Sequence, residues 1–326
     1  MASLSDISRH AGVSIATCSR VLNGSAHPVS DATRERVMQA AQELGYAPSA
    51  LARALVTRSS RIIGVIVGDI VDPYFAEIAR GVEAVGADLG YLTMVCSAEL
   101  GTEAELAHLQ QLRDYQAAGI IFAGSGRIRD PSTHDLAQAV ADARERGSVV
   151  VALAQRDFDA HSIVFDNEAA AHDITAYVRE LGHERITFVE GPPGLHTSAL
   201  RLKGFLRAGG SDRVHGGFAY EDGIAAAERL LGRERLPEAI VAANDEAAIG
   251  VLMRLRDAGV DVPGQVSITG IDNTRPAQFV GLTTVSVPLH EMGRRAAHAV
   301  LGNPADHVVL PHRLAPRNTT ARRARS

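Results

Sequence analysis

Cysteine is scarce in this sequence: the 326 residues contain two, Cys18 and Cys96. They stand in segments that are predicted to belong to different domains, so they provide neither a disulfide framework nor a cluster of metal ligands, and they fit a reducing cytoplasm. The thirteen histidines are scattered without a metal-ligand spacing. We therefore expect no metal site and no cofactor.

Long apolar runs are also absent. The longest, such as residues 62–68 and 119–123, have the length of a strand and fall far below the roughly 20 residues of a membrane helix. The first residues lack the basic start and apolar core of a secretory signal. These absences predict a soluble, cytoplasmic protein without membrane contact. Its length, with 46 % hydrophobic and 22 % charged residues, predicts more than one folded unit.

Several motifs of enzymes are missing. The sequence contains no G-x-S-x-G, no phosphate-binding G-x-x-x-x-G-K-[ST], no H-E-x-x-H and no dinucleotide-binding G-x-G-x-x-G after a strand. A hydrolase or a kinase therefore finds no support, and we expect a protein that is not an enzyme.

The charge of the chain is unevenly distributed. Residues 1–61 hold seven Arg and four Asp or Glu, a net charge of +3, which leaves −8 for the remainder of a chain whose total is −5. A modestly basic head on an acidic body is typical of a DNA-reading module joined to a regulatory domain, because contacts to phosphates supply most of the non-specific affinity for DNA.

The first sixty residues predict three short helices. A capping-box pattern at Ser3 opens the first, which runs to about residue 10, and Ser14 caps a second over residues 15–22. Ser30 caps a third, which ends near Gly45. The apolar residues expected to form the small core of this domain are Ile7, Ala11, Val13, Val21, Leu22, Val37, Ala41 and Leu44.

From residue 61 onward, apolar strands alternate with amphipathic helices. The predicted strands are residues 62–67, 92–96, 120–123, 149–154, 186–189, 240–242 and 267–270, with helices near 75–89, 102–116 and 133–146. Such continuous apolar strands indicate parallel sheets that are covered on both faces. Because the rhythm restarts after residue 154, we expect two doubly wound lobes, with a ligand crevice at the carboxyl ends of their strands.

Several segments of the chain match, in order and spacing, those of a known family. In the head they are Ala11-Gly12-Val13-Ser14, Thr17, Ser19-Arg20-Val21-Leu22-Asn23-Gly24 and Leu44-Gly45-Tyr46-Ala47-Pro48. In the body they are Asp72-Pro73-Tyr74-Phe75, Leu181-Gly182-His183, Arg201, Gly204-Phe205, Ala243-Asn244-Asp245, Gly270-Ile271-Asp272 and Leu282-Thr283-Thr284. Over nearly its whole length, the chain resembles the lactose/galactose repressor (LacI/GalR) family of transcriptional regulators.

The resemblance implies a fold and a domain organisation. An all-α helix-turn-helix head would occupy residues 1–46, and a hinge helix with its linker residues 47–60. An α/β two-lobed domain like the periplasmic binding proteins, with two doubly wound parallel sheets, would occupy residues 61–326 and dimerise. The tail after Pro311 has no apolar heptad repeat that could join more chains, so we expect a homodimer.

The resemblance also assigns residues that bind DNA, with the second helix in the major groove. They are Ser14, Ile15, Ala16, Thr17, Arg20, Asn23 and His27 in the head and Leu51, Ala52 and Leu55 in the hinge. Arg20 can bond a guanine in bidentate fashion, whereas Ile15 and Ala16 can read a base only by apolar contact. The alternative for Ile15 and Ala16 is a place in the core. Cys18 is interpreted as a small buried hydrophobe, not as a redox sensor.

The segment 48–55 resembles the hinge helix of the family, which inserts a leucine, here Leu55, into the minor groove of the operator. Isolated helices shorter than about 12 residues are marginal, so we expect this helix to fold only with DNA and with the hinge of the partner chain.

A small molecule is expected between the lobes. Arg201 offers a fork of donors, Asp272 a pair of acceptors and Asn244 both functions, while Tyr74, Phe75 and Phe218 offer flat apolar faces. The sequence departs from the common pattern of the family at Gln155-Arg156, where many relatives have Asp-Arg, and at Leu289, where some sugar-binding members carry an aromatic residue.

Together these features predict a sequence-specific DNA-binding transcriptional repressor. The homodimer would bind pseudo-palindromic double-stranded operator DNA under the control of a small effector, for which a neutral sugar is favoured over a nucleobase. Two alternatives stay open: a ligand-binding protein of periplasmic type without a DNA role, and a regulator with a purine or nucleoside as corepressor.

Overall fold

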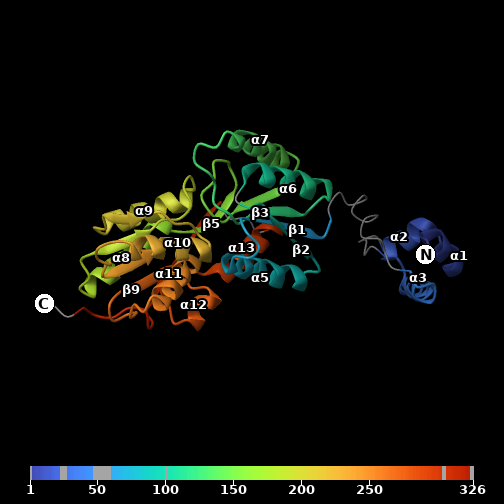
Figure 1. The fold of residues 1–326 in the computed structure, drawn as a ribbon. Helices are drawn as coiled ribbons and strands as arrows, with labels where there is room; N and C mark the ends of the chain where they lie inside the picture. The colour runs from blue at the N-terminus through green and yellow to red at the C-terminus, as the bar shows by residue number, and fades with distance from the viewer. Residues whose placement is uncertain (1, 23–27, 47–59, 100, 303–305, 324–326) are drawn as a thin grey trace. The chain divides into compact units, whose positions relative to one another are not determined.

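The computed structural model describes residues 2–22, 28–46, 60–99, 101–302 and 306–323. The chain divides into two compact units, residues 1–61 and 62–326 (Figure 1). The hinge segment expected over 47–60 lies outside the described residues, except for its last residue. No helix in the described ranges has the length and apolar character to span a membrane.

The N-terminal unit contains the three expected helices, α1 (Leu4–Ala11), α2 (Ile15–Leu22) and α3 (Asp31–Glu43). The capping box is present at Ser3: its hydroxyl accepts the N–H of Asp6, and the Asp6 carboxylate accepts the N–H of Ser3 at 3.0 Å. Ser14 and Ser30 likewise accept N–H groups at the starts of α2 and α3. Local hydrogen bonding therefore sets all three helix starts, as the sequence predicts.

A small core joins these helices. Ile7, Cys18 and Val37 are fully buried, one from each helix. Burial raises the pKa of the Cys18 thiol, so this side chain behaves as the small hydrophobe that the sequence indicates.

In the C-terminal unit, the first lobe is built on a six-stranded sheet. Its strands are β1 (Ile62–Val67), β2 (Leu92–Ser97), β3 (Gly119–Phe122), β4 (Val149–Ala152), β5 (His161–Phe165) and β11 (His307–Leu310), in the spatial order β11-β5-β4-β3-β1-β2, and all are parallel. Helices α5 (Pro73–Asp88) and α13 (Leu289–Val300) pack on one face and α6 (Thr102–Asp114) and α7 (Ser132–Glu145) on the other. The apolar strands are thus covered on both faces, as expected.

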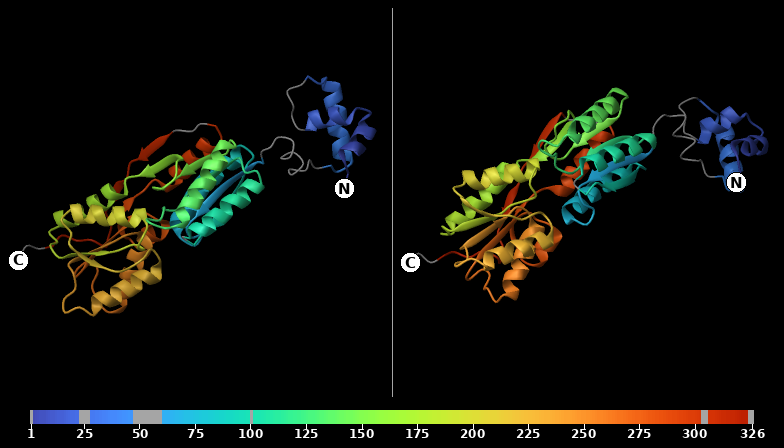
Figure 2. Two further views of the ribbon diagram at one scale, coloured as in Figure 1. Left: turned by 90° about the horizontal axis from the view of Figure 1, so that it is seen from above. Right: turned by 45° about the horizontal axis from the view of Figure 1, so that its top comes forward.

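The second lobe repeats this plan. Its strands are β6 (Ile186–Val189), β7 (Asp212–Val214), β8 (Ala239–Ala242), β9 (Ser267–Asp272), β10 (Thr283–Ser286) and β12 (Arg313–Ala315), in the order β12-β10-β9-β8-β6-β7, and β12 alone among them is antiparallel to its neighbour. Helices α8 (Asn167–Glu180) and α9 (His196–Arg207) cover one face, α10 (Tyr220–Leu231) and α11 (Asp245–Asp257) the other, and α12 (Arg275–Phe279) is a short turn after β9 (Figure 2). The predicted architecture of two doubly wound lobes is confirmed.

The lobes are not two successive halves of the chain. After β5 the chain passes to α8 in the second lobe, after β10 it returns to α13 and β11 in the first, and it then crosses once more to β12. Three connections therefore join the lobes. The sequence pattern missed β5, β7, β10, β11 and β12, which lack the continuous buried apolar run of the central strands. Polar or charged side chains interrupt β5, β7, β10 and β12, and β11 begins with an exposed histidine and is only partly buried.

Candidate functional site

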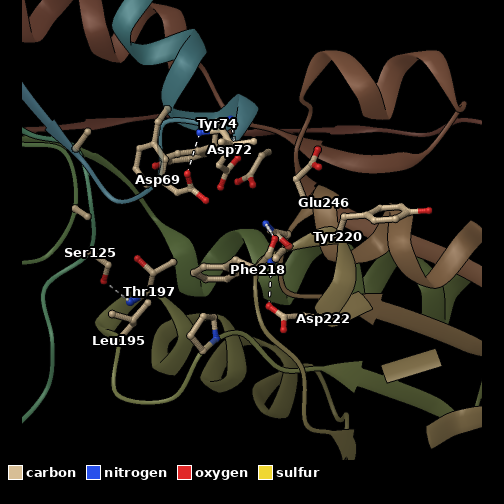
Figure 3. A pocket seen from close by; sticks show the side chains of 18 of the residues that line it. Asp69, Asp72, Tyr74, Ser125, Leu195, Thr197, Phe218, Tyr220, Asp222 and Glu246 are labelled. Carbon is tan, nitrogen blue, oxygen red and sulfur yellow. Dashed lines mark hydrogen bonds between the residues drawn. The ribbon is translucent and has the colours of Figure 1, made fainter. Parts of the chain in front are cut away.

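A cavity of about 330 Å³ lies at the carboxyl ends of the strands, and residues from both lobes line it (Figure 3). Asp69 and Tyr74 follow β1 and Ser125 follows β3 in the first lobe, whereas Phe218 follows β7 and Asn244 follows β8 in the second. Ligands of doubly wound sheets bind in the crevice outside the carboxyl ends of the strands, so the position of this cavity is typical of a ligand site.

Direct hydrogen bonds join the two lobes beside this cavity. The N–H of Thr197, at the start of α9, donates to the Ser125 hydroxyl at 3.1 Å. The His196 ring lies 3.1 Å from the Asp157 carboxylate, and its backbone N–H donates to the Gly126 carbonyl at 3.1 Å. The cavity is therefore bounded on this side by contacts that a relative movement of the lobes would break.

The cavity brings together all six residues that the sequence analysis assigned to the effector. Tyr74, Phe75, Arg201, Phe218, Asn244 and Asp272 all belong to its lining. Several of these side chains also hold the lobe together, which the sequence did not indicate.

Arg201 is the clearest case, because only 3 % of the residue is exposed. Its Nε donates to Asn167 Oδ1 at 2.8 Å, one terminal nitrogen donates to the Ala243 carbonyl, and the other donates to Asp272 Oδ1 at 3.0 Å. A guanidinium has five N–H groups, so about two remain for a ligand. Arg201 therefore ties the end of β8 to the end of β9 and to the start of α8.

Asp272, the last residue of β9, is the buried carboxyl group that pairs with Arg201. Only 3 % of the residue is exposed, and its φ of 127° is a backbone conformation that residues other than glycine rarely adopt. Burial raises the pKa of its carboxyl well above the usual value, and the Arg201 guanidinium opposes that shift. One carboxylate oxygen accepts from Arg201, and the other is available as an acceptor in the cavity.

Asn244 is the N-cap of α11. Its Oδ1 accepts the N–H of Ala247 at 3.0 Å, and its Nδ2 donates to the Phe218 carbonyl at 2.9 Å. The amide thus fixes the loop that carries Phe218, whose ring lies 5.8 Å from the guanidinium carbon of Arg201. On the other lobe, Tyr74 and Phe75 pack edge to face with ring centroids 5.0 Å apart.

Sequence reasoning missed a group of acidic residues in the lining: Asp69, Asp72, Glu221, Asp222 and Glu246. Burial raises the pKa of Asp72 to about 6 and that of Glu246 to about 7. Two of them lie in or next to segments that match the family: Asp72 begins the Asp-Pro-Tyr-Phe segment, and Glu246 directly follows Asn244-Asp245. Their convergence depends on the fold.

The two departures from the family pattern, at Gln155-Arg156 and at Leu289, lie outside the described lining of the cavity. Gln155 is exposed, whereas the side chain of its neighbour Arg156 is buried. Arg156 pairs with Glu105, donates to the Gly124 carbonyl at 2.9 Å, and lies 5.0 Å from the ring centroids of both Phe122 and Phe158. It therefore serves the interior of the first lobe and is not among the described residues that line the cavity. Leu289, at the start of α13, is 4 % exposed and likewise lies outside this lining.

In the N-terminal unit, α2 presents an open surface. Ile15 is 51 % exposed, and Ser14, Ala16 and Arg20 are exposed as well, so Ile15 and Ala16 do not belong to the core. Thr17 is half-buried, and its N–H donates to the Ser14 hydroxyl at 3.1 Å. The other residues assigned to DNA lie outside the described residues: Asn23, His27, Leu51, Ala52 and Leu55.

Comparison with known proteins identifies the family. Residues 3–49 match the model for bacterial regulatory proteins of the lacI family, and residues 175–320 match that for a periplasmic binding protein-like domain. The chain is 33 % identical to catabolite control protein A of Priestia megaterium over 97 % of this chain and 98 % of that protein. The chain belongs to the LacI family.

Other comparisons agree that the chain is a member of the LacI family. It is 33 % identical to the HTH-type transcriptional repressor CytR of Escherichia coli K12, over 90 % of this chain and 87 % of that protein. A crystal structure of the lac repressor dimer bound to operator and the anti-inducer ONPF superimposes with a TM-score of 0.86 at 25 % identity, covering 98 % of this chain and 99 % of that one. These relatives are transcriptional regulators, and this chain is a DNA-binding transcriptional regulator of the same family.

Proposed function

We propose that this regulator is a homodimeric repressor whose affinity for a pseudo-palindromic operator is set by a small polar effector bound between the two lobes of residues 62–326. The observation that carries the proposal is the cavity of about 330 Å³ that both lobes line. A ligand that contacts both lobes stabilises one relative arrangement of them, and it can shift a conformational equilibrium by its difference in affinity for the two arrangements.

The exposed side chains of α2 supply the reading surface in this proposal. Arg20 would bond a guanine, and Ile15 and Ala16 would contact an apolar group such as a thymine methyl in the major groove. Ser14, Thr17, Asn23 and His27 would contribute the remaining contacts of the head. Leu51, Ala52 and Leu55 belong to the proposed hinge of residues 47–60, through which effector binding would reach the operator.

The effector in this proposal is a sugar or a sugar derivative. Asp272 keeps one carboxylate oxygen for hydroxyl groups, Arg201 keeps about two N–H groups, and Asn244 has further hydrogen-bonding capacity. The rings of Tyr74, Phe75 and Phe218 can cover the apolar face of a sugar ring. This combination suits a ligand with many hydroxyl groups and one apolar face.

The test is a gel-shift assay with the full-length protein and DNA fragments from around its own gene, followed by footprinting. We expect a protected site with two mirrored half-sites and a ligand-dependent change in affinity within a panel of sugars, polyols, nucleosides and nucleobases. Protection of one asymmetric half-site at full affinity refutes the dimeric operator complex. A response to nucleobases alone, with stronger DNA binding, replaces the sugar-responsive repressor by a corepressed regulator.

A further inference from the structure

We propose that the effector of this regulator carries a positive charge, as an amino sugar does, and that its ammonium group lies between Asp72 of the first lobe and Glu246 of the second. This inference rests on the function proposed above, because it concerns the same cavity, and it replaces the neutral sugar that the sequence favours.

The first argument is the balance of charge in the cavity. Six carboxylates belong to the lining: Asp69, Asp72, Glu221, Asp222, Glu246 and Asp272. Arg201 is the only basic side chain among the described residues of the lining, and its guanidinium is already paired with Asp272 at 3.0 Å. Five acidic side chains therefore remain without a cation in the lining, and this excess favours a cationic ligand.

Helix capping explains some of these acids but not all. Asp69 accepts the N–H of Val71 at 2.9 Å, Asp72 accepts that of Tyr74 at 2.8 Å, and Asp222 accepts that of Ala219 at 3.1 Å. These three carboxylates have local structural roles at turns and helix starts.

Glu246 differs, because its Oε1 atom is buried and has no hydrogen-bond partner in the described part of the chain. A buried acceptor without a donor is unfavourable, and native proteins keep few of them. Glu246 is the second residue of α11 and belongs to the cavity lining, so a ligand that donates an N–H or O–H group can supply the missing bond.

The second argument is electrostatic coupling across the cleft. The pKa of the Glu246 carboxyl is raised to about 7. Burial is the largest cause, and the negative charges of Asp72, Asp245 and Glu221 contribute the rest. Asp72 stands on the opposite lobe, as the N-cap of α5, and burial raises its pKa to about 6. A neutral sugar would remove water from both carboxyl groups without relieving their repulsion, whereas an ammonium group would offset it.

The shape of the cavity agrees with a small organic cation. Its volume of about 330 Å³ is at the lower end of the range for ligand sites, which suits a monosaccharide. Figure 3 shows Tyr74 beside Asp72 and Asp69 on one side of the cavity and Phe218 on the other. Aromatic faces attract cations as well as apolar ring surfaces, so they suit an amino sugar better than a simple inorganic cation.

The experiment compares matched ligands on the full-length protein. D-glucosamine and D-galactosamine are tested by thermal shift and calorimetry against D-glucose, D-galactose and N-acetyl-D-glucosamine, which have similar shape and no charge. We expect at least one amine to bind at least tenfold more tightly than its neutral counterparts. Its binding at pH 7 should release protons, seen as a dependence of the binding enthalpy on the ionisation enthalpy of the buffer, because a cation lowers the pKa values of nearby carboxyl groups.

Two variants and a control locate the effect. Glu246→Gln and Asp72→Asn, in which asparagine can still cap α5, should each weaken amine binding at least tenfold and reduce proton release, and each loss should be larger for the amine than for its neutral counterpart. The control is Glu103→Gln, an exposed glutamate that is likewise the second residue of a helix, α6, and it should bind as the parent protein does.

The inference is overturned if neutral sugars bind as tightly as their amines, if no amine binds, or if both variants retain the preference for the amine. The function proposed above is tested separately by the operator complex. If a neutral ligand changes operator affinity, the proposal of an effector-controlled repressor stands and that of a cationic effector is refuted. If an amine binds without changing operator affinity, the proposal of a cationic ligand stands and that of effector control is refuted.

Discussion

Replacement of Glu246 by Gln should stabilise the ligand-free protein, and the gain should grow with pH. The carboxyl group of Glu246 has a pKa of about 7 in the folded protein, raised by burial and by the charges of Asp72, Asp245 and Glu221, against an ordinary value of 4.5. Between these two values the folded protein binds more protons than the unfolded chain does. Stability is therefore lost as the pH rises from about 4.5 to about 7.

The size of the effect follows from the same two pKa values. A difference of one unit corresponds to about 1.4 kcal/mol, so the full shift would correspond to about 3 kcal/mol. Because the side chain is only partly buried, solvent screening reduces this, and we expect about 1 kcal/mol. A glutamine has no charge to bury, so the variant should melt about 2–4 °C above the parent at pH 8 and close to it at pH 5.

The assay is a thermal or urea unfolding series from pH 5 to pH 8 for the parent, Glu246→Gln and Glu103→Gln. Glu103 occupies the same position in the first turn of its helix and is exposed, so its replacement removes a similar interaction with the helix dipole but no cavity charge. A gain for Glu246→Gln that is constant with pH, or that the control shares, would contradict the assigned ionisation.

Three further variants test other parts of the molecule. Arg201→Met should lower the free energy of unfolding by about 3–5 kcal/mol, measured by urea denaturation, because it leaves the buried Asp272 carboxylate without its ion pair; an unchanged midpoint would refute the structural role of Arg201. Arg20→Ala should cost about 1–3 kcal/mol of operator binding and relax specificity at one base pair in each half-site, measured by fluorescence anisotropy on mutated operators; equal losses on all sequences would make Arg20 a phosphate contact. Leu55→Ala should weaken operator binding markedly and leave effector binding intact, and a parallel loss of effector affinity in calorimetry would exclude a role limited to the DNA.

Local signals made the N-terminal unit predictable from sequence. Ser3, Ser14 and Ser30 act through hydrogen bonds within three residues, so the sequence alone contains what is needed to find the helix starts. The central strands were equally visible because burial on both faces makes them continuously apolar. Edge strands such as β7 and β12 are short and partly exposed, and their residues form strands only because a neighbouring strand is present.

The site was predictable only in part, because its chemistry depends on pairs that are distant in the chain. Arg201 and Asp272 could be named from family segments. Their hydrogen bond joins residues that are 71 positions apart, and no local sequence pattern predicts it. Arg156 and Glu105 are 51 residues apart, so the sequence showed a missing aspartate and not the carboxylate that partners the arginine. The strained backbone of Asp272 and the buried Oε1 atom of Glu246, which has no hydrogen-bond partner in the described part of the chain, likewise arise from tertiary packing.

The three crossings between the lobes impose an order on biosynthesis. The first lobe needs α13 and β11, which come from residues 289–310, although its other strands are translated before residue 166. While the ribosome is translating the second lobe, the nascent first lobe therefore exposes the edge of β5 and the apolar face of α5 that α13 later covers. A chain terminated just before residue 289 would therefore leave the core of the first lobe incomplete, and not only that of the second lobe. The lobe that begins synthesis first is completed almost last.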